Sequence, residues 1–422
     1  MTIIGIDDTD SRTMGMCTTY VGHQIADELV EKYNASVERV LLTRLNPAAK
    51  HKTRGNASVA IHTDADIDEA YSTAVDMVEK YSVVDDDNTN PGVVVTDMQE
   101  IPEEVSSFTN KAMHTLLNIS EAEEIIEKYD FRSFHYGNGR GRIGSLAAIG
   151  AWDAFNDWTY EHISYRYPEP RGTERDVDAE SVVNAANKHH PKVWDTIDRT
   201  QGDIVCVPHT PCPILHGIRG DDKDAVKDVA KDIKSEPVES RQTFVTNQGT
   251  DVHLQEEKLE NIQDDSAYIV TGTITTEPTT KEGGHVFFEV GNNKGDTIEV
   301  AAFEPTKHFR HKVRELRVDD EITLCGGVSE GTLKLEKFNL HSLNKTELTN
   351  PTCEDCNRSM SSMGANQGYR CRSCKKTKES KVEVEVERNI EKGWYEVPPC
   401  ARRHISKPLV RTKTSEKTHP ST

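Results

Sequence analysis

Four cysteines carry the most specific chemical signal in the chain. Cys353 and Cys356 form one C-x2-C pair, Cys371 and Cys374 form a second, and 14 residues separate the two pairs. Two such pairs can close a tetrahedral thiolate site around Zn²⁺, and four protein ligands leave no position open for a substrate. The spacing therefore predicts a structural zinc site, since free or disulfide-bonded cysteines would need no such spacing. The remaining cysteines are interpreted as ordinary small residues: Cys17, Cys206, Cys212, Cys325 and Cys400.

A group of carboxylates follows the first apolar segment of the chain. The sequence IGIDDTD at 4–10 places Asp7, Asp8 and Asp10 within four residues. Carboxylates this close repel one another unless a cation or hydrogen-bond donors offset their charge, and oxygen ligands of this kind suit Mg²⁺. The pattern indicates a magnesium-nucleotide site. A turn that caps the next helix is the structural alternative, because Asp and Thr are favoured there.

A second loop supplies positive charge. The sequence KHKTRGN at 50–56 contains Lys50, Lys52 and Arg54. Acids from one loop and cations from another could together hold a magnesium-bound triphosphate, which phosphoryl transfer requires. We expect these two loops to meet.

A glycine-rich run, GNGRGRIG at 137–144, precedes the apolar segment SLAAIGAW. Glycines let backbone amides approach a phosphate, and the following segment could begin a helix whose N-terminus faces an anion. The run does not match a Walker motif, and a glycine-rich turn is equally explained by backbone geometry. The candidate phosphate contacts are Gly137, Gly139, Arg140 and Gly141.

The elements that must position these residues follow a β-α-β-β-α-β order over the first hundred residues. This is the ferredoxin-like succession, so an α+β domain is predicted, with the carboxylates after the first strand and the cations between the middle strands. A helical stretch at 111–129 and a second α+β domain ending near 253 should follow. The strands are expected at 2–6, 37–45, 57–63 and 92–98, and the helices at 18–33 and 68–81.

Five short apolar strands with one helical stretch before the fourth are predicted between 266 and 343, which is the order of an OB-fold β-barrel. OB folds often bind nucleic acid through aromatic and basic side chains, although fold alone does not establish function. The phenylalanines among the candidates would equally fill the barrel interior. The candidate contacts are Phe303, Lys307, Phe309, Arg310, Lys312 and Arg314.

The net charge of −20 opposes an RNA-binding function, because a negative surface repels phosphates. Adaptation to a cytoplasm of very high salt is the alternative explanation, since salt screens exposed charges within a few ångströms. Residues 347–422 differ, with 15 Lys and Arg against 10 Asp and Glu. They could contact phosphates or form a disordered basic tail. No run of about 18 apolar residues is present, so a soluble cytoplasmic protein without membrane contact is expected.

Several motifs in fixed order resemble the archaeal tRNA-isoleucine 2-agmatinylcytidine synthetase family. They are IGIDDTDS with GMCTTY, RLNPAAKHKTRGN, YGNGRGRIGSLAAIG, PCPILHGIRG, NQGTDVHL and GGHVFFEV. The resemblance covers about residues 1–376. It implies an ATP-dependent ligase that phosphorylates ring position two of the wobble cytidine of an isoleucine tRNA with a CAU anticodon. Agmatine then displaces the phosphate, with AMP and phosphate as products. The implied cofactors are ATP, magnesium and structural zinc, and no obligatory protein partner is expected.

The resemblance also assigns residues. It places Asp7, Asp8 and Asp10 at the magnesium-nucleotide site, Lys52 and Arg54 on phosphates, and Thr18 at the threonine that the family autophosphorylates. Otherwise Thr18 would only open a helix. Isolated histidines are more often structural than catalytic, but motif position makes four residues candidate agmatine contacts: His135, Tyr136, Cys212 and His216.

The resulting prediction is an α+β multidomain protein. Its domains are a kinase-like domain of ferredoxin-like order (1–130), a ferredoxin-like agmatine-binding domain (131–255), an OB-fold tRNA-binding barrel (266–345), a zinc ribbon (350–376) and an unassigned basic tail (377–422). Two alternatives remain. A single-stranded nucleic-acid binding protein would use only the barrel and ribbon, and a small-molecule kinase would leave both without a role.

Overall fold

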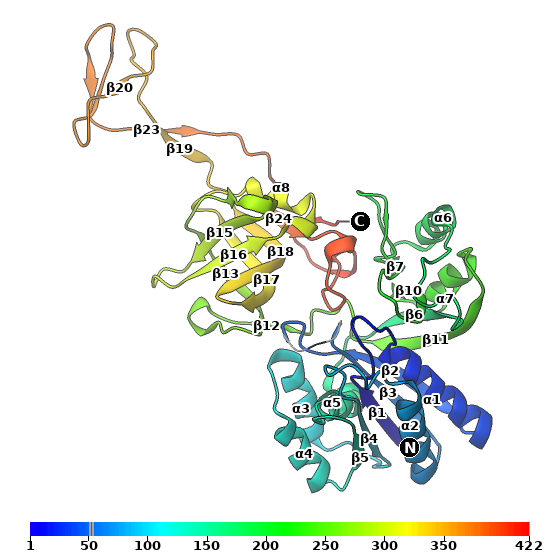
Figure 1. Cartoon of the computed structure of the whole chain (residues 1–422). Coiled ribbons are helices and arrows are strands. Elements are labelled where there is room, and N and C mark those ends of the chain that lie inside the picture. The colour runs from blue at the N-terminus through cyan, green and yellow to red at the C-terminus, as the bar shows by residue number, and fades with distance from the viewer. Residues whose placement is uncertain (50–51, 53–54, 422) are drawn as a thin grey trace.

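The computed structural model describes residues 1–49, 52 and 55–421 (Figure 1), so Lys50 and Arg54 lie outside the described residues. Two sheets of nine strands form the framework, and three small sheets accompany them. Among the described residues, no helix is both long enough and apolar enough to cross a membrane.

The predicted β-α-β-β-α-β succession is present and forms an antiparallel sheet in the order β4-β1-β3-β2. The apolar sides of α1 and α2 pack on one face, where Ile4, Ile6, Val21 and Ile25 belong to one buried cluster. The elements are β1 (Thr2–Asp7), α1 (Thr18–Tyr33), β2 (Val37–Arg44), β3 (Ala57–Thr63), α2 (Ile67–Tyr81) and β4 (Gly92–Thr96).

The helical stretch predicted at 111–129 is two helices with an earlier start. They are separated at Thr115–Asn118, where the Glu121 carboxylate accepts a hydrogen bond from the Asn118 N–H at 2.8 Å and caps the second helix. The next strand pairs with β4, and the helix after it packs on β1. Residues 132–154 were predicted to belong to the second domain, and in the structure their strand extends the first sheet while their helix covers it. These elements are α3 (Glu103–His114), α4 (Ile119–Lys128), β5 (Arg132–His135) and α5 (Gly141–Ala154).

The next segment repeats the same strand order, β11-β6-β10-β7, with α6 and α7 packed on one face. Its strand β11 runs parallel to β2, so the two halves share one nine-stranded sheet. Asn247 reinforces the junction, because its side chain bonds both the N–H and the C=O of Arg44 at 2.8 and 3.0 Å. The elements are β6 (Thr159–Arg166), α6 (Ala179–His189), β7 (Val193–Trp194), β8 (Ile197–Asp198), β9 (Asp203–Ile204), β10 (Ile214–Gly220), α7 (Lys223–Asp232) and β11 (Val238–Thr246).

The predicted five-stranded barrel is closed in the order β13-β15-β16-β18-β17, with the last strand returning to the first. Its core includes Phe288, Phe309 and Phe338, so Phe309 fills the interior. The elements of this region are β12 (Leu254–Glu256), β13 (Ala267–Ile274), β14 (Thr279–Thr280), β15 (Val286–Gly291), β16 (Thr297–Ala302), α8 (Phe309–Arg314), β17 (Glu321–Ser329) and β18 (Thr332–Ser342).

The cysteine pairs lie in a small module that stands away from the barrel on a two-stranded stalk (Figure 1). The stalk pairs β19 (Thr346–Thr349) with β23 (Val382–Glu385). Beyond it, three short strands form the module: β20 (Ser361–Ser362), β21 (Tyr369–Arg370) and β22 (Thr377–Lys378).

The chain after the stalk is folded and is not a disordered tail. It adds β24 (Gly393–Glu396) and β25 (Thr418–His419) to the barrel sheet, and the segment between these two strands runs between the barrel and the large sheet (Figure 1, red). Its basic side chains form internal ion pairs: Arg388 with Asp320, Arg402 with Asp195 and Glu396, and Arg411 with Asp157 and Asp221. These cations therefore neutralise acids of the same chain.

Three buried histidines should make the folded protein less stable in mild acid. Burial lowers the pKa of His62, His162 and His216 to about 4 in the folded protein, whereas an unfolded histidine titrates near 6.5. Between these values the unfolded chain binds protons that the native chain does not, so stability falls as pH falls from 6.5 toward 4. The three together could contribute up to about 4 kcal/mol per pH unit.

Denaturant unfolding at fixed KCl between pH 7.5 and 5 measures this slope. The variant His216→Gln should show a shallower slope than the unsubstituted chain, and a free energy of unfolding that stays constant over the range would contradict the prediction.

Candidate functional site

A cavity of about 1150 Å³ opens between the two halves of the large sheet and the C-terminal segment. Its size exceeds that of a typical drug-sized pocket, so it has room for more than one ligand. Seven of the predicted site residues line it. They are Asp7, Asp8, Asp10, Thr18, Lys52, Arg140 and Cys212.

The carboxylates lie at the end of β1 and in the turn that follows. Asp8 adopts a left-handed backbone conformation (φ 57°), which turns the chain sharply at this point. Its carboxylate accepts hydrogen bonds from the Asn90 N–H at 3.1 Å and from Arg140 at 2.7 Å. Burial raises the pKa of both Asp7 and Asp8, and Asp8 raises that of Asp7 further. A bound divalent cation would offset this repulsion, so the donor set fits magnesium.

The glycine-rich run brings α5 into contact with the carboxylates. A Cβ on Gly144 would lie 1.9 Å from an Asp7 carboxylate oxygen, and one on Gly141 would lie 2.4 Å from the Gly92 nitrogen. Gly137 and Gly139 form the turn before the helix with positive φ and do not line the cavity. Within this run, glycine therefore serves mainly the close packing of the helix on β1 and β4.

Thr18 is the first residue of α1 and is buried beside the carboxylates. Its hydroxyl oxygen accepts a hydrogen bond from Thr9 at 3.1 Å. The N-terminal end of a helix favours negative charge, so a phosphate on this oxygen would be stabilised there.

Positive charge gathers around the C-terminal segment where it reaches the cavity. Lys52 lies near Arg403 and Lys334, and burial together with these two cations lowers the pKa of Lys52 to about 8. Arg44 and Arg219 also line the cavity. The cluster provides several cations for phosphate groups.

The second half contributes a loop and several positions of β6 and β10 to the cavity, among them Ile163 and Ile214. Residues 205–206, 208–210 and 212 line it together with Glu161 of β6 and Gly217 and Arg219 of β10. The Glu161 carboxylate is buried and accepts a hydrogen bond from Gln248. Outside the Asp7–Asp10 turn, Glu161 supplies the one carboxylate among the described residues that line this cavity.

Three predicted substrate contacts lie away from the cavity. His135 ends β5 at the edge of the sheet, and the Tyr136 hydroxyl donates to Glu79 of α2 at 2.8 Å. His216 is buried on the other face of β10, where burial, then Arg241 and His162, lower its pKa. Alternation along β10 explains this, because Gly217 and Arg219 face the cavity and their neighbours do not.

The candidate contacts on the barrel differ in how accessible their side chains are. Phe309 is a core residue, and Arg310 is engaged by Gly284 and Glu304. Lys312 and Arg314 are exposed, and Phe303 and Lys307 are half-buried.

Sequence reasoning missed several cavity residues. Arg44 and Arg219 lie inside the quoted motifs RLNPAAKHKTRGN and PCPILHGIRG, so their signal was present but not singled out. Residues 402–405 lie in the basic stretch that was predicted either to contact phosphates or to be a disordered tail, but no motif after residue 376 assigned them to this cavity.

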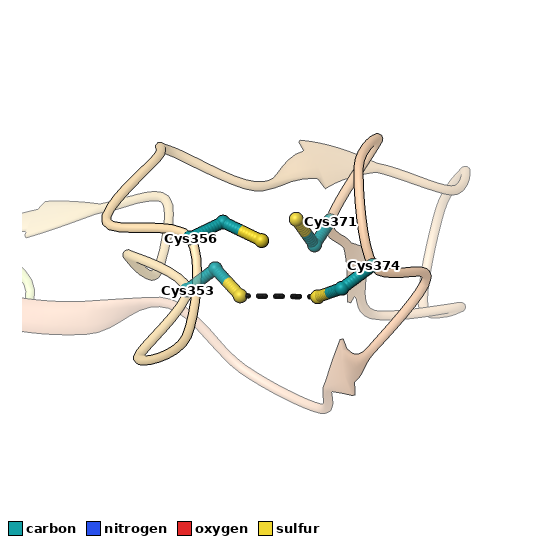
Figure 2. A group of neighbouring side chains, drawn as sticks. All are labelled: Cys353, Cys356, Cys371 and Cys374. Carbon is teal, nitrogen blue, oxygen red and sulfur yellow. Dashed lines mark hydrogen bonds between the residues drawn. The ribbon is translucent and has the colours of Figure 1, made fainter.

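The four cysteines of the C-x2-C pairs converge (Figure 2). Their sulfur atoms lie within 4.8 Å of one another, and those of Cys353 and Cys374 are 3.3 Å apart. Backbone N–H groups of Cys374 and Ser373 lower the pKa of Cys371 to about 6, which favours its thiolate. The donor set and its geometry fit one tetrahedral zinc ion.

Removing one ligand should empty this site without disturbing the cavity. The variant Cys353→Ser is expected to lose its zinc, and its arm beyond the stalk should become protease-sensitive, because zinc binding supplies most of the folding free energy of such modules. Elemental analysis and limited proteolysis measure both effects. Cys400→Ser is the matched control and should keep one zinc per chain, whereas full zinc content in Cys353→Ser would contradict the assignment.

Family models match most of the chain. The TiaS TCKD domain matches residues 3–138, the TiaS FLD domain 139–253 and the TiaS C-terminal zinc ribbon domain 350–390. The tRNA-isoleucine 2-agmatinylcytidine synthetase TiaS of Haloquadratum walsbyi is 48% identical over 97% of this chain and 98% of its own length. The protein of the same name from Methanosarcina acetivorans is 42% identical over 99% and 100%.

Solved structures agree. A complex of TiaS with its isoleucine tRNA and ATP matches with a TM-score of 0.90 and 39% identity, and a complex of TiaS with the same tRNA, AMPCPP and agmatine matches with 0.87 and 38%. Each covers 100% of this chain and 99% of the solved chain. With motifs, cavity, barrel and zinc ribbon in place, the chain belongs to the tRNA-isoleucine 2-agmatinylcytidine synthetase (TiaS) family.

Proposed function

We propose that this chain is an ATP-dependent ligase that attaches agmatine to ring position two of the wobble cytidine of the CAU-anticodon isoleucine tRNA. The observation that carries the proposal is the cavity that joins the acidic turn of the first half to the loop and strands of the second. Relatives with the same architecture are named for this activity, and their solved complexes contain that isoleucine tRNA with ATP, or with AMPCPP and agmatine. A tRNA substrate puts the reaction in the cytoplasm.

The chemistry requires activation of the cytosine oxygen. That oxygen leaves poorly until it is phosphorylated. The amine of agmatine then forms the new C–N bond as the C–O bond breaks, and phosphate departs with the oxygen. Holding nucleotide, cytidine and amine in one cavity supplies the orientation that both steps need.

We assign the nucleotide end of the cavity to Asp7, Asp8 and Asp10, with Arg140 and Lys52 beside them. Magnesium held by these carboxylates would neutralise the charge that develops on the phosphates. Arg140 orients Asp8, and Lys52 can reach a phosphate. Thr18, buried among these groups, is the proposed site of autophosphorylation.

We assign agmatine to the second half, with Cys212 on the cavity wall and Glu161 as the carboxylate that pairs with one of its two cationic ends. Agmatine is an amine with a guanidinium group, and a buried carboxylate is the natural partner for either. Glu161 replaces His135, Tyr136 and His216 in this role, because those three lie outside the cavity.

We propose that the first half is the kinase-like domain and that the second half is the ferredoxin-like agmatine-binding domain. The barrel and the zinc ribbon then bind the tRNA body. The acidic surface then suits a halophilic archaeon whose salt screens repulsion. A non-catalytic single-strand binding protein is not favoured, because it leaves the acidic turn, Thr18 and Glu161 without a role in one cavity.

The test is label transfer from radiolabelled agmatine to a transcript of the isoleucine tRNA with ATP, magnesium and molar KCl. Transfer should require all three substrates and fall by about 10³-fold in Asp8→Ala, because the cation that would stabilise charge at the reacting phosphate loses a proposed ligand. The exposed Asp228→Ala is the control and should match the unsubstituted chain. Equal transfer by Asp8→Ala would remove Asp8 from the mechanism, and no transfer by the unsubstituted chain would refute the proposed activity.

A further inference from the structure

The cavity lacks the aromatic side chains that usually hold a nucleobase. Among the described residues that line it there is no Phe, Tyr or Trp, and the only ring side chains other than proline are the imidazoles of His209 and His404. Proteins that act on a base outside a helix stack it on a flat ring and bond its edge. These two imidazoles are therefore the aromatic surfaces that the described cavity wall offers, beside the guanidinium planes of its arginines.

The backbone of His404 is fixed from both sides. Its carbonyl accepts a hydrogen bond from the Gly249 N–H at 2.8 Å, and the carbonyl of Ile405 accepts from Thr250 at 3.1 Å. Ile405 belongs to the core of the first sheet, and Arg402 is buried in ion pairs with Asp195 and Glu396. The imidazole between these anchors nevertheless remains exposed at the cavity wall. The backbone that carries this ring is thus held in place before any ligand arrives.

The electrostatic surroundings keep this ring uncharged. Desolvation by the surrounding protein, then the charges of Arg44 and Arg219, lowers the pKa of His404 well below 6.5, even though the side chain is exposed at the cavity wall. A neutral imidazole offers a flat face, one donor and one acceptor. The adjacent guanidinium groups can meet the phosphates that flank a nucleoside.

His209 is less suited to the same task. It lies on the segment between β9 and β10, where Arg175 donates to the carbonyls of Pro208 and Thr210 on either side of it at 2.7 and 2.9 Å. We choose the ring of His404 because Arg44 and Arg219 lie close to it and can meet flanking phosphates.

We propose that His404 is the surface against which the target cytosine of the tRNA is placed, so that the C-terminal segment completes the nucleoside-binding part of the cavity. This inference rests on the proposed function for the identity of the base. It adds a substrate-contacting residue from a part of the chain that carries no recognised motif.

The experiment uses an anticodon stem-loop of the isoleucine tRNA with fluorescent pyrrolocytosine at the wobble position, because stacking quenches this base. The unsubstituted chain should quench it on binding, His404→Ala should not, and His404→Phe should restore quenching. With full tRNA and agmatine, His404→Ala should lower kcat/KM for tRNA by about 10-fold to 100-fold, as expected for one lost base stack. The Kd of the His404→Ala variant for ATP should equal that of the unsubstituted chain.

His209→Ala is the matched control and should quench like the unsubstituted chain. Zinc content and thermal melting show that each variant is folded, and His404→Phe keeps the test decisive if the alanine variant is unstable. Normal quenching by His404→Ala would overturn the proposal, as would an equal loss of ATP binding, which would assign the ring to adenine. Absent agmatine transfer by the unsubstituted chain would refute the proposed function instead, because quenching does not depend on transfer.

Discussion

Replacing Gly144 with alanine is expected to lower agmatine transfer by about 10²-fold or more while leaving the chain folded, since it displaces Asp7, which we propose holds the nucleotide's cation, and a shift of about 1 Å can have that effect. The new methyl group would lie 1.9 Å from the nearest Asp7 oxygen and 2.9 Å from the Asp7 Cβ. The whole Asp7 side chain must therefore move. Steady-state kinetics with saturating ATP measure the loss.

Gly150→Ala provides a matched control on the same helix. A Cβ there would lie 2.5 Å from the Thr109 hydroxyl and 2.7 Å from the Val105 carbonyl, so it crowds α3 and not the acidic turn. Both variants should lose about 1–3 kcal/mol of stability through overpacking. Only Gly144→Ala should lose most of its activity. Equal losses of activity in both would show that Gly144 matters for packing alone.

Arg402→Ala is expected to destabilise the protein by about 3–5 kcal/mol, because it removes the cation between two buried carboxylates and leaves Asp195 only a 3.9 Å contact with Arg219. Arg402 bonds Asp195, lies 2.9 Å from a Glu396 oxygen and donates to the Val397 carbonyl at 3.1 Å. The three charged side chains are almost fully buried, so salt screens them little. The loss should persist when unfolding is measured from about 1 to 4 M KCl.

Lys417→Ala is the control for that measurement. Lys417 pairs with Glu391, and both side chains are exposed, so its removal should have no measurable effect at high salt. A destabilisation of Arg402→Ala that disappears in molar salt would show that the pair is accessible to solvent.

Local patterns predicted the elements and the zinc site well. The first six elements, the five barrel strands and the four convergent cysteines all lie where spacing and alternation placed them. These features depend on residues close in sequence. The acidic turn is similar, because Asp7, Asp8 and Asp10 follow one strand and share the cavity with Thr18.

The remaining features depend on contacts that no local pattern encodes. Nothing near Arg402 or His404 indicates that this segment returns to the first sheet, because Asp195, Gly249 and Ile405 meet only in the folded chain. Likewise, His216 was chosen from its motif, but the face of β10 on which it lies depends on the local register. The basic composition of the last segment did not indicate that several of its cations form ion pairs with acids of the same chain.

The continuous sheet through β2 and β11 limits how the enzyme can move during a catalytic cycle. A hinge motion that separates the two halves would break the backbone hydrogen bonds between these strands and the Asn247 contacts to Arg44. The distance between the acidic turn and Glu161 is therefore fixed, and no free energy is spent on bringing these walls together at each turnover. The slow step should then be the arrival or departure of the large RNA, and turnover should respond to solvent viscosity more strongly than to substitutions on the side of the cavity that we assign to agmatine.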